Sequence, residues 1–274
     1  MMNKQPEVIQ IVFISALLSQ IFMPLTVSAN HSWSNYHWAR TQNTMELQVI
    51  NSVTSEWQTD LDITIMDWNQ AYALDMSITS SNNSTKIRKR CNATSGKIRV
   101  CNAAYGNNGW LGLASINVDS SGHITKGTAK MNDSYASYWE DPNEKAHVMC
   151  QEVGHLFGLG HTSEDGSSQK TCMDYSNEPN STRPNYDHDI ILLNTIYEHP
   201  DNYDSYAIAG GGTTEPTPCR GGPKKCGSGS GSTTDNGNSD FGRGHLIRSN
   251  EFYEEWVEYY ADGSKTVYHV TLAH

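Results

Sequence analysis

The chain has 274 residues, a formal net charge of −11 and 36% hydrophobic residues, enough for one domain with a substantial core and additional segments. An acidic balance of this size argues against a nucleic-acid partner, because phosphates are bound by a basic surface. The same balance is ordinary for a secreted protein, so it identifies no substrate.

Residues 1–29 have the features of a signal peptide. Lys4 supplies a positive charge, an apolar run extends from Ile9 to Leu18, and Val27-Ser28-Ala29 offers the small residues that signal peptidase prefers. A membrane anchor is the alternative, but polar residues and a proline interrupt the apolar stretch soon after. We therefore predict a secreted mature chain that begins near Asn30, with no stable membrane insertion after cleavage.

The six cysteines form an even number in a chain that we expect to be exported, which favours disulfides. They fall into three near pairs: Cys91 and Cys101, Cys150 and Cys172, Cys219 and Cys226. Near-neighbour pairing is the prediction, although the sequence alone does not select among the possible pairings. A cysteine-rich zinc site is the alternative, but no pair has the two-residue spacing that such sites favour.

Residues 30–209 have the pattern of a globular domain. Apolar residues alternate from Met45 to Val49, which predicts a strand, and they recur three or four apart from Trp57 to Trp68, which predicts a helix. Turns are expected at Asn107-Asn108-Gly109 and Ser120-Ser121-Gly122. Further strands are expected near Leu74–Ile78, Lys97–Cys101, Trp110–Val118 and His123–Lys130, with helices near Asn143–Phe157 and Tyr186–Tyr197. This order predicts an α+β fold with a mixed sheet.

The C-terminal part has two segments of different composition. Residues 210–238 are rich in Gly, Ser, Thr and Pro, which predicts a flexible linker. Residues 239–274 predict a β-hairpin, because Trp256–Leu272 alternates around Asp262-Gly263, a signal for a two-residue turn. An isolated hairpin is marginal in water, and this one carries large aromatic residues, so we expect it to dock on the preceding domain or on a partner.

The stretch from Gln151 to His161 carries the strongest chemical signal. Gln151 and His155 lie four apart, so on a helix both side chains leave one face and can hold one metal ion. Glu152 is turned by about 100°, where it can act on a metal-bound water without being a ligand. Gly158 can end the helix and return the chain, so that His161 converges with the other two. We predict Gln151, His155 and His161 as metal ligands.

Three protein ligands leave the fourth position of zinc for water and lower the pKa of that water towards neutrality. Glu152 then takes the proton during attack on a peptide carbonyl and later delivers it to the leaving amine. The alternative interpretation is an amphipathic core helix with incidental histidines.

This segment resembles the metzincin zinc-peptidase motif, H-E-x-x-H-x-x-G-x-x-H, with glutamine in place of the first histidine. Metzincins also carry a methionine turn beneath the metal, and Thr171-Cys172-Met173-Asp174-Tyr175 is well placed for one. The tyrosine two residues after the methionine resembles the astacin and serralysin branches. The resemblance implies that Tyr175 ligates zinc or stabilises the oxyanion; a core or rim aromatic is the alternative. The resemblance covers only residues 151–175 by motif. In the order of its helices and strands it covers about residues 45–200.

The resemblance has further implications. Gly109–Ala114 would be the edge strand that pairs with an extended substrate, although an ordinary sheet strand is an equal alternative. A Cys150–Cys172 disulfide would tie the active-site helix to the methionine turn. We expect His147 to be exposed, because it lies one turn too far from His155 to replace Gln151 as a ligand. Three other histidines, His123, His188 and His199, have no ligand spacing.

The resulting prediction is a matrixin- or astacin-like, metzincin-type zinc endopeptidase that is secreted and cleaves protein or peptide substrates. A non-catalytic pseudo-peptidase, a binding or scaffold protein with a weakened metal site, is the main alternative. Retention of Glu152 favours the enzyme, whereas the loss of the first histidine favours the scaffold, because an amide oxygen suits zinc less well than an imidazole nitrogen. A metal-dependent amidase that acts on a non-protein substrate is a third possibility.

Overall fold

The computed structural model describes residues 31–206, except residue 177, and residues 244–273. The predicted signal peptide (1–29), the predicted linker (210–238) and the Cys219–Cys226 pair lie outside the described residues.

A nine-stranded mixed sheet organises the described residues, as the α+β prediction requires. Its order is β3-β2-β4-β6-β5-β9-β8-β7, and β1 pairs with β6 in addition. The strands β1, β2, β3, β4 and β6 pair in parallel, whereas β5, β9, β8 and β7 form antiparallel pairs. Their bounds are β1 His37–Trp38, β2 Met45–Ser52, β3 Leu74–Ser81, β4 Lys97–Ala103, β5 Trp110–Val118, β6 His123–Asn132, β7 His245–Ser249, β8 Tyr253–Tyr259 and β9 Lys265–Leu272.

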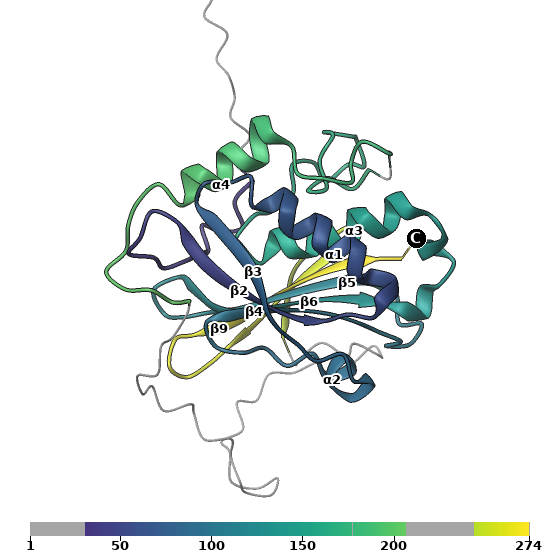
Figure 1. Ribbon diagram of the computed structural model, residues 1–274, viewed down its shortest axis with the longest axis horizontal. Helices are drawn as coiled ribbons and strands as arrows, with labels where there is room; N and C mark the ends of the chain where they lie inside the picture. Colours follow the sequence, from purple (N-terminus) through teal and green to yellow (C-terminus); the bar gives the residue numbers. More distant parts are fainter. Residues whose placement is uncertain (1–30, 177, 207–243, 274) are drawn as a thin grey trace, which may run out of the picture.

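Two long helices, α1 (Ser55–Trp68) and α3 (Pro142–His155), lie together on one face of the sheet, and α2 (Thr85–Arg90) lies beyond the opposite face (Figure 1). The start of α3 follows local chemistry: the Asp141 carboxylate accepts from the Asn143 N–H at 2.8 Å, and Pro142 occupies the first turn. The predicted helix near Tyr186–Tyr197 is a π-helical turn, Tyr186–Ile190, continued by α4, Ile191–Ile196. Short 3-10 turns occupy Asp133–Tyr135 and Tyr138–Glu140.

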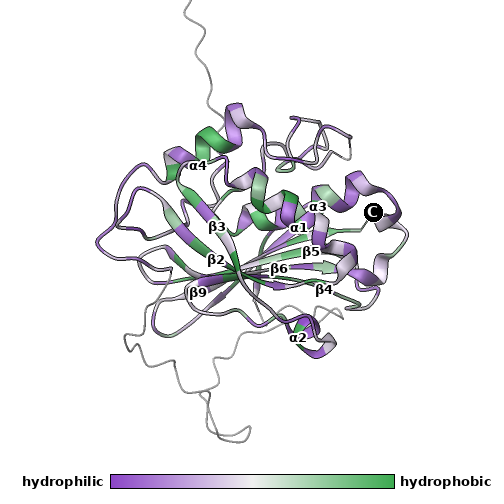
Figure 2. Cartoon of the chain, in the orientation of Figure 1, coloured by the Kyte–Doolittle hydropathy of each residue, from purple (hydrophilic) through white to green (hydrophobic). Residues whose placement is uncertain are grey.

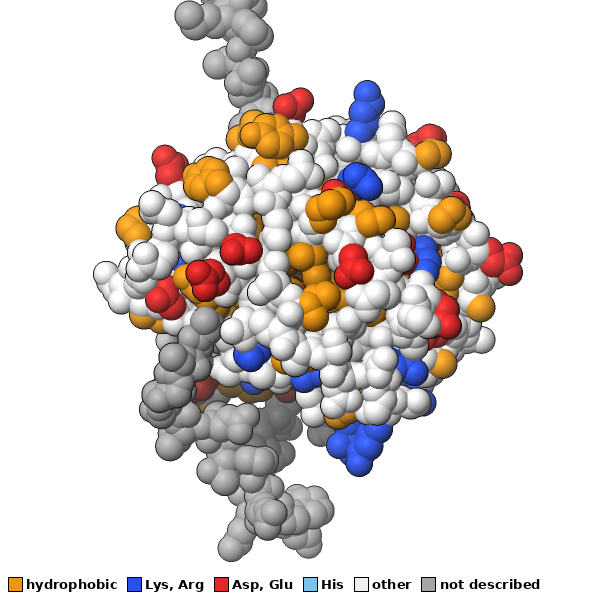
Figure 3. Space-filling model, viewed as in Figure 1, with side chains coloured by type: hydrophobic (Ala, Val, Ile, Leu, Met, Phe, Trp, Pro, Cys, Tyr) orange, Lys and Arg blue, Asp and Glu red, His pale blue; other side chains and the backbone are white. Residues whose placement is uncertain are grey.

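The core lies between the sheet and helices α1 and α3. Trp57, Leu61 and Trp68 project from one face of α1 and are buried, as the helical spacing predicts. Apolar residues concentrate along the central strands and the inner sides of these helices, whereas α2 is mostly hydrophilic (Figure 2). The face seen in Figure 3 carries scattered acidic and basic side chains, with small groups of hydrophobic side chains among them.

The C-terminal hairpin belongs to the same sheet, which confirms that it docks on the preceding domain. Strand β9 pairs antiparallel with β5, with Leu113 opposite Val270, and β8 pairs with β9. Its turn differs from the prediction. The N–H of Tyr260 bonds to the carbonyl of Ser264 at 2.9 Å, so three residues form the loop instead of two. Gly263 takes the left-handed conformation at φ 84°, as in hairpins that add a bulge after a tight turn.

The docking of β9 overturns the expectation that Gly109–Ala114 is a free edge for substrate. These residues fall in β5 or directly before it, and β5 is paired on one side with β6 and on the other with β9. The backbone groups that an extended peptide would use are therefore already bonded within the chain.

Two predicted disulfides are present, Cys91–Cys101 and Cys150–Cys172. The second ties α3 to the segment that contains Met173, as expected from the sequence. No helix of the described residues has both the length and the apolar character needed to cross a bilayer.

Candidate metal centre

The end of α3 brings two predicted ligands together. The helix stops at His155, and Gly158 has φ +90°, the conformation that favours glycine. A Cβ at Gly158 would lie 1.7 Å from the carbonyl oxygen of Tyr36, so no other residue fits this close approach. The redirected chain places Nε2 of His161 3.1 Å from Nε2 of His155, as predicted.

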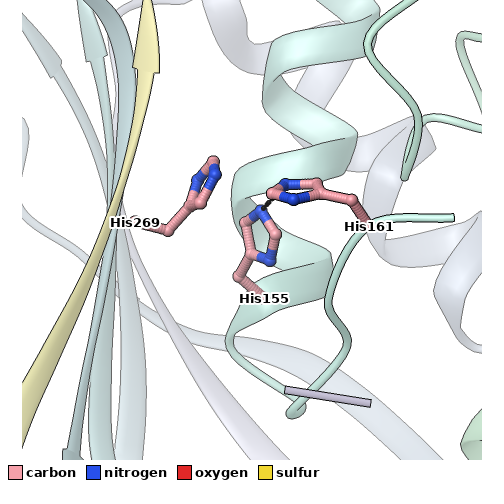
Figure 4. A group of neighbouring side chains, drawn as sticks. All are labelled: His155, His161 and His269. Carbon is pink, nitrogen blue, oxygen red and sulfur yellow. Dashed lines mark hydrogen bonds between the residues drawn. The ribbon is translucent and has the colours of Figure 1, made fainter. Parts of the chain in front are cut away.

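A third imidazole comes from β9. The ring centroid of His269 lies 4.0 Å from that of His155 and 4.5 Å from that of His161. One nitrogen of each ring lies within 4.8 Å of the others, close enough for one metal ion. Figure 4 shows the three side chains meeting between β9 and the end of α3. No motif in the sequence points to His269 as a ligand, because it lies 94 residues after Tyr175, the last of the predicted site residues.

Gln151, the third ligand predicted from the sequence, has its amide engaged elsewhere. Its Nε2 donates to the backbone carbonyl of Asp174 at 2.8 Å, and its Oε1 lies 3.0 Å from the hydroxyl oxygen of Thr271. The side chain is completely buried. Gln151 therefore joins the segment that contains Asp174 to β9, while His269 lies beside His155 and His161.

His147 is buried, so the expectation that it is exposed is wrong. Its Nδ1 lies 2.7 Å from the carbonyl oxygen of Ser181. The loop that contains Ser181 lies against this face of α3 and covers the imidazole. A periodic helix pattern cannot reveal such a covering loop.

The protonation states of the three imidazoles suit metal binding. The carbonyl of Leu159 can only accept, so Nδ1 of His155, 2.8 Å away, carries the proton and Nε2 carries the lone pair. Burial lowers the pKa of His155 and of His269 to about 3, and lowers that of His161 well below its usual value. Neutral imidazole is the form that binds a metal.

The Glu152 carboxylate lies beside these rings and is fully buried. Burial raises its pKa to about 7, against the opposing effects of His155 and the hydrogen bond from Thr271. Its Oε1 accepts from the Thr271 hydroxyl at 2.6 Å. Its Oε2 lies 3.8 Å from Nδ1 of His269, and neither atom has a hydrogen-bond partner among the described residues. Gly112 of β5 makes this position possible, because a Cβ there would lie 2.3 Å from Oε1.

Tyr175 points its hydroxyl at the same cluster. The hydroxyl oxygen lies 2.7 Å from Nε2 of His161 and 3.0 Å from Nε2 of His269. The ring stacks on Tyr253 of β8 with centroids 5.3 Å apart, and burial raises its pKa well above the usual value. Met173 packs below, against Gly154 of α3 and next to Trp68.

A cavity of about 190 Å³ opens onto the three imidazoles. Its wall includes the aromatic side chains of Trp33 and Tyr253. It also includes a charged group, the Arg248 group, in which the guanidinium of Arg248 pairs with the carboxylate of Glu255 at 3.0 Å and with that of Glu164 at 3.7 Å. A second, larger cavity, about 630 Å³, is lined by Tyr175 and Thr271 and by the acidic side chains of Asp141 and Glu144.

Comparison with known proteins returned no match: no protein-family model fits the chain, and no curated protein sequence is significantly similar to it. The resemblance to metzincins therefore depends on the motif residues alone.

Proposed function

We propose that this protein is a zinc-dependent peptidase whose metal is held by His155, His161 and His269. The observation that carries the proposal is the convergence of three buried, neutral imidazoles beside a buried carboxylate, Glu152. Three imidazoles form a common donor set for catalytic zinc, which needs one further position for water or substrate. The two disulfides support a secreted location, since such bonds persist outside the cytoplasm.

The donor set fits zinc because a neutral imidazole offers a nitrogen lone pair, and zinc does not have to displace a proton from a charged ring. When bound, the ion supplies a Lewis acid that polarises a carbonyl and acidifies water. Glu152, with a pKa raised to about 7, accepts a proton from the attacking water and returns it to the leaving amine. The Tyr175 hydroxyl donates a hydrogen bond to the oxygen that becomes negative.

Substrate reaches this centre through the cavity beside Trp33 and Tyr253. Because β9 occupies the side of β5 expected for substrate pairing, binding depends on that cavity and on the Arg248 group. A volume of about 190 Å³ accommodates one or two residues of a peptide. The substrate is therefore a peptide that inserts a side chain or an end, without adding a strand to β5.

The test combines metal content with hydrolysis by the purified mature chain. Zinc should bind, cleavage of a pool of internally quenched peptides should be sensitive to a chelator, and zinc should restore it. Peptides blocked at either end distinguish internal from terminal cleavage. A chain that binds zinc but cleaves no member of the pool would contradict the peptidase proposal.

One observation favours a second candidate, the non-catalytic pseudo-peptidase. Glu152 has no exposed surface, and its Oε1 already accepts a hydrogen bond from Thr271. A protein that uses zinc only to fix β9 against α3 would have the same contacts. It would bind zinc and lose stability without it, yet show no hydrolysis with peptides or with small amides.

A further inference from the structure

We propose that His37, His123, His199 and Asp201 form a second, structural zinc site, built from residues outside the motif segment 151–175. This proposal is independent of the proposed peptidase function, because none of the four residues belongs to the cluster around His155. Three of them, His37, His199 and Asp201, have one ligand atom each within 4.8 Å of the others.

The four side chains come from three separate segments. His37 in β1 stands directly opposite His123 in β6, because the two strands pair in parallel with these residues in register. His199 and Asp201 follow α4, where the chain returns to β1. The N–H of Arg40 donates to Oδ2 of Asp201 at 2.9 Å, and this bond holds the returning segment beside β1.

Four of the distances between donor atoms lie between 3.2 and 3.8 Å, near those of a tetrahedral zinc site. Oδ1 of Asp201 lies 3.2 Å from Nε2 of His123, 3.7 Å from Nε2 of His37 and 3.8 Å from Nε2 of His199. The Nε2 atoms of His37 and His199 are 3.3 Å apart. Zinc bonds of about 2.0–2.1 Å to nitrogen and oxygen in a tetrahedron place the donors about 3.3–3.4 Å from one another.

In His37 and His123, the hydrogen bonds made by Nδ1 leave the lone pair of Nε2 facing the Asp201 carboxylate. Nδ1 of His37 lies 2.9 Å from the carbonyl oxygen of Asn35, which can only accept, so the proton resides on Nδ1. Nδ1 of His123 lies 2.8 Å from the hydroxyl oxygen of Tyr203, whose own proton is donated to Asp119. In a ring that carries only this Nδ1 proton, Nε2 is an acceptor directed at another acceptor, Asp201, and a cation between them resolves the conflict.

These outer contacts are those that orient zinc ligands in proteins. A histidine ligand normally donates its second N–H to a carbonyl or to a polar group linked to a carboxylate, as His37 and His123 do. Asp201 likewise has one oxygen bound by the backbone of Arg40 and the other directed at the histidines. Three nitrogen donors and one carboxylate favour zinc over magnesium or calcium.

Four protein ligands leave no position for water, so this site is structural. It would fasten β1 to β6 and to the segment after α4. The stretch just before β1 includes Trp33, whose ring lies 5.4 Å from that of His155 and which lines the cavity at the candidate metal centre. Zinc at the second site therefore also fixes one wall of that cavity.

The experiment measures zinc per chain in the full-length mature protein after dialysis against metal-free buffer. His199→Ala is the main variant, because the His199 side chain is 55% exposed and its removal should leave the fold intact. The control is His245→Ala, an exposed histidine on β7. We expect His199→Ala to hold one zinc fewer than the wild type and His245→Ala to hold the same number. Equal zinc content in wild type and His199→Ala overturns the proposal.

A second measurement follows the melting temperature with and without added zinc in the His269→Ala background, where the other site is impaired. Zinc should still raise the melting temperature there, and this rise should disappear when His199→Ala is added. If added zinc leaves the melting temperature unchanged in the His269→Ala background, the cluster is a hydrogen-bonded group and not a metal site. A chain that keeps zinc at this second site but cleaves no peptide would contradict the proposed peptidase function and leave the second-site proposal intact.

Discussion

The hydroxyl of Thr271 lies 2.6 Å from Oε1 of Glu152, so β9 directly contacts the carboxylate proposed as the general base. The same hydroxyl lies 3.0 Å from the amide oxygen of Gln151. Two residues earlier on β9, His269 faces the other two imidazoles. The C-terminal hairpin is thus part of the candidate site, and the predictions below follow from that contact.

His269→Ala should remove most of the zinc affinity of the candidate centre. Only His155 and His161 would remain as ligands. The change should weaken zinc binding by about 100-fold or more, since even the loss of a residue that only hydrogen-bonds to a ligand costs about 10–100-fold. Competition with a chromophoric chelator measures the dissociation constant. His245→Ala is the matched control and should bind as the wild type does. Unaltered affinity in His269→Ala would exclude this residue as a ligand.

Gln151→Ala should affect the fold more than the metal. The carbonyl of Asp174 and the hydroxyl of Thr271 would lose a buried partner, which costs about 1–3 kcal/mol in the free energy of unfolding. Zinc affinity should fall far less than in His269→Ala. Urea unfolding of the zinc-free proteins and zinc titrations separate the two effects. A loss of zinc binding as large as that of His269→Ala would restore Gln151 as a ligand.

Glu152→Gln should retain zinc and the fold but reduce peptide hydrolysis by about 10²–10⁴-fold, the usual contribution of a positioned general base. The amide has the same shape and can still accept from Thr271. Turnover with saturating peptide, compared at equal zinc content, provides the measurement. Hydrolysis at the wild-type rate would contradict the role of Glu152.

Asp189 should make stability depend on pH at the acidic end. Burial acts to raise its pKa, but hydrogen bonds from His188, His31, Thr171 and the N–H of Asn185 outweigh burial and lower the pKa to about 2. Because the folded pKa lies below the unfolded value of 3.8, the stabilisation is complete above about pH 4 and is lost as pH falls towards 2.

The expected loss over that interval is about 2 kcal/mol, from roughly two pKa units. Other carboxylates also titrate there, so the wild type is compared with Asp189→Asn by urea unfolding at pH 5 and pH 2.5. The free-energy difference between the two proteins should shrink on acidification. A difference that is constant with pH would show that Asp189 has an ordinary pKa.

Local chemistry explains which parts of the fold were predictable. The bounds of α3 follow from the Asp141 cap, Pro142 and the glycine at 158, all within a few residues of the helix ends. Strand β5 is as predicted, Trp110–Val118, because its apolar run lies between glycine-containing turns. Helix α2 was missed because it is six residues long and buries no side chain, so it leaves no periodic pattern.

The candidate site was only partly predictable for a different reason. His155, Glu152 and His161 lie on one helix and its return, where spacing determines direction. His269 and His37 reach their clusters through strand pairing over long separations, and an alternating pattern does not say which strand a segment will pair with. The glutamine at 151 was the one local clue, because it left the motif one imidazole short.

The pairing of β9 with β5 also determines when the candidate centre can be completed during synthesis. His155 and His161 emerge from the ribosome long before His269, so a nascent chain has only two of the three imidazoles until residues beyond Thr271 have been added. Metal capture by the full set therefore waits until β9 has been synthesised. Proteolysis anywhere between Tyr206 and β7 that releases the hairpin would return the centre to its incomplete state, so hydrolysis would require an intact connection or a hairpin that stays bound.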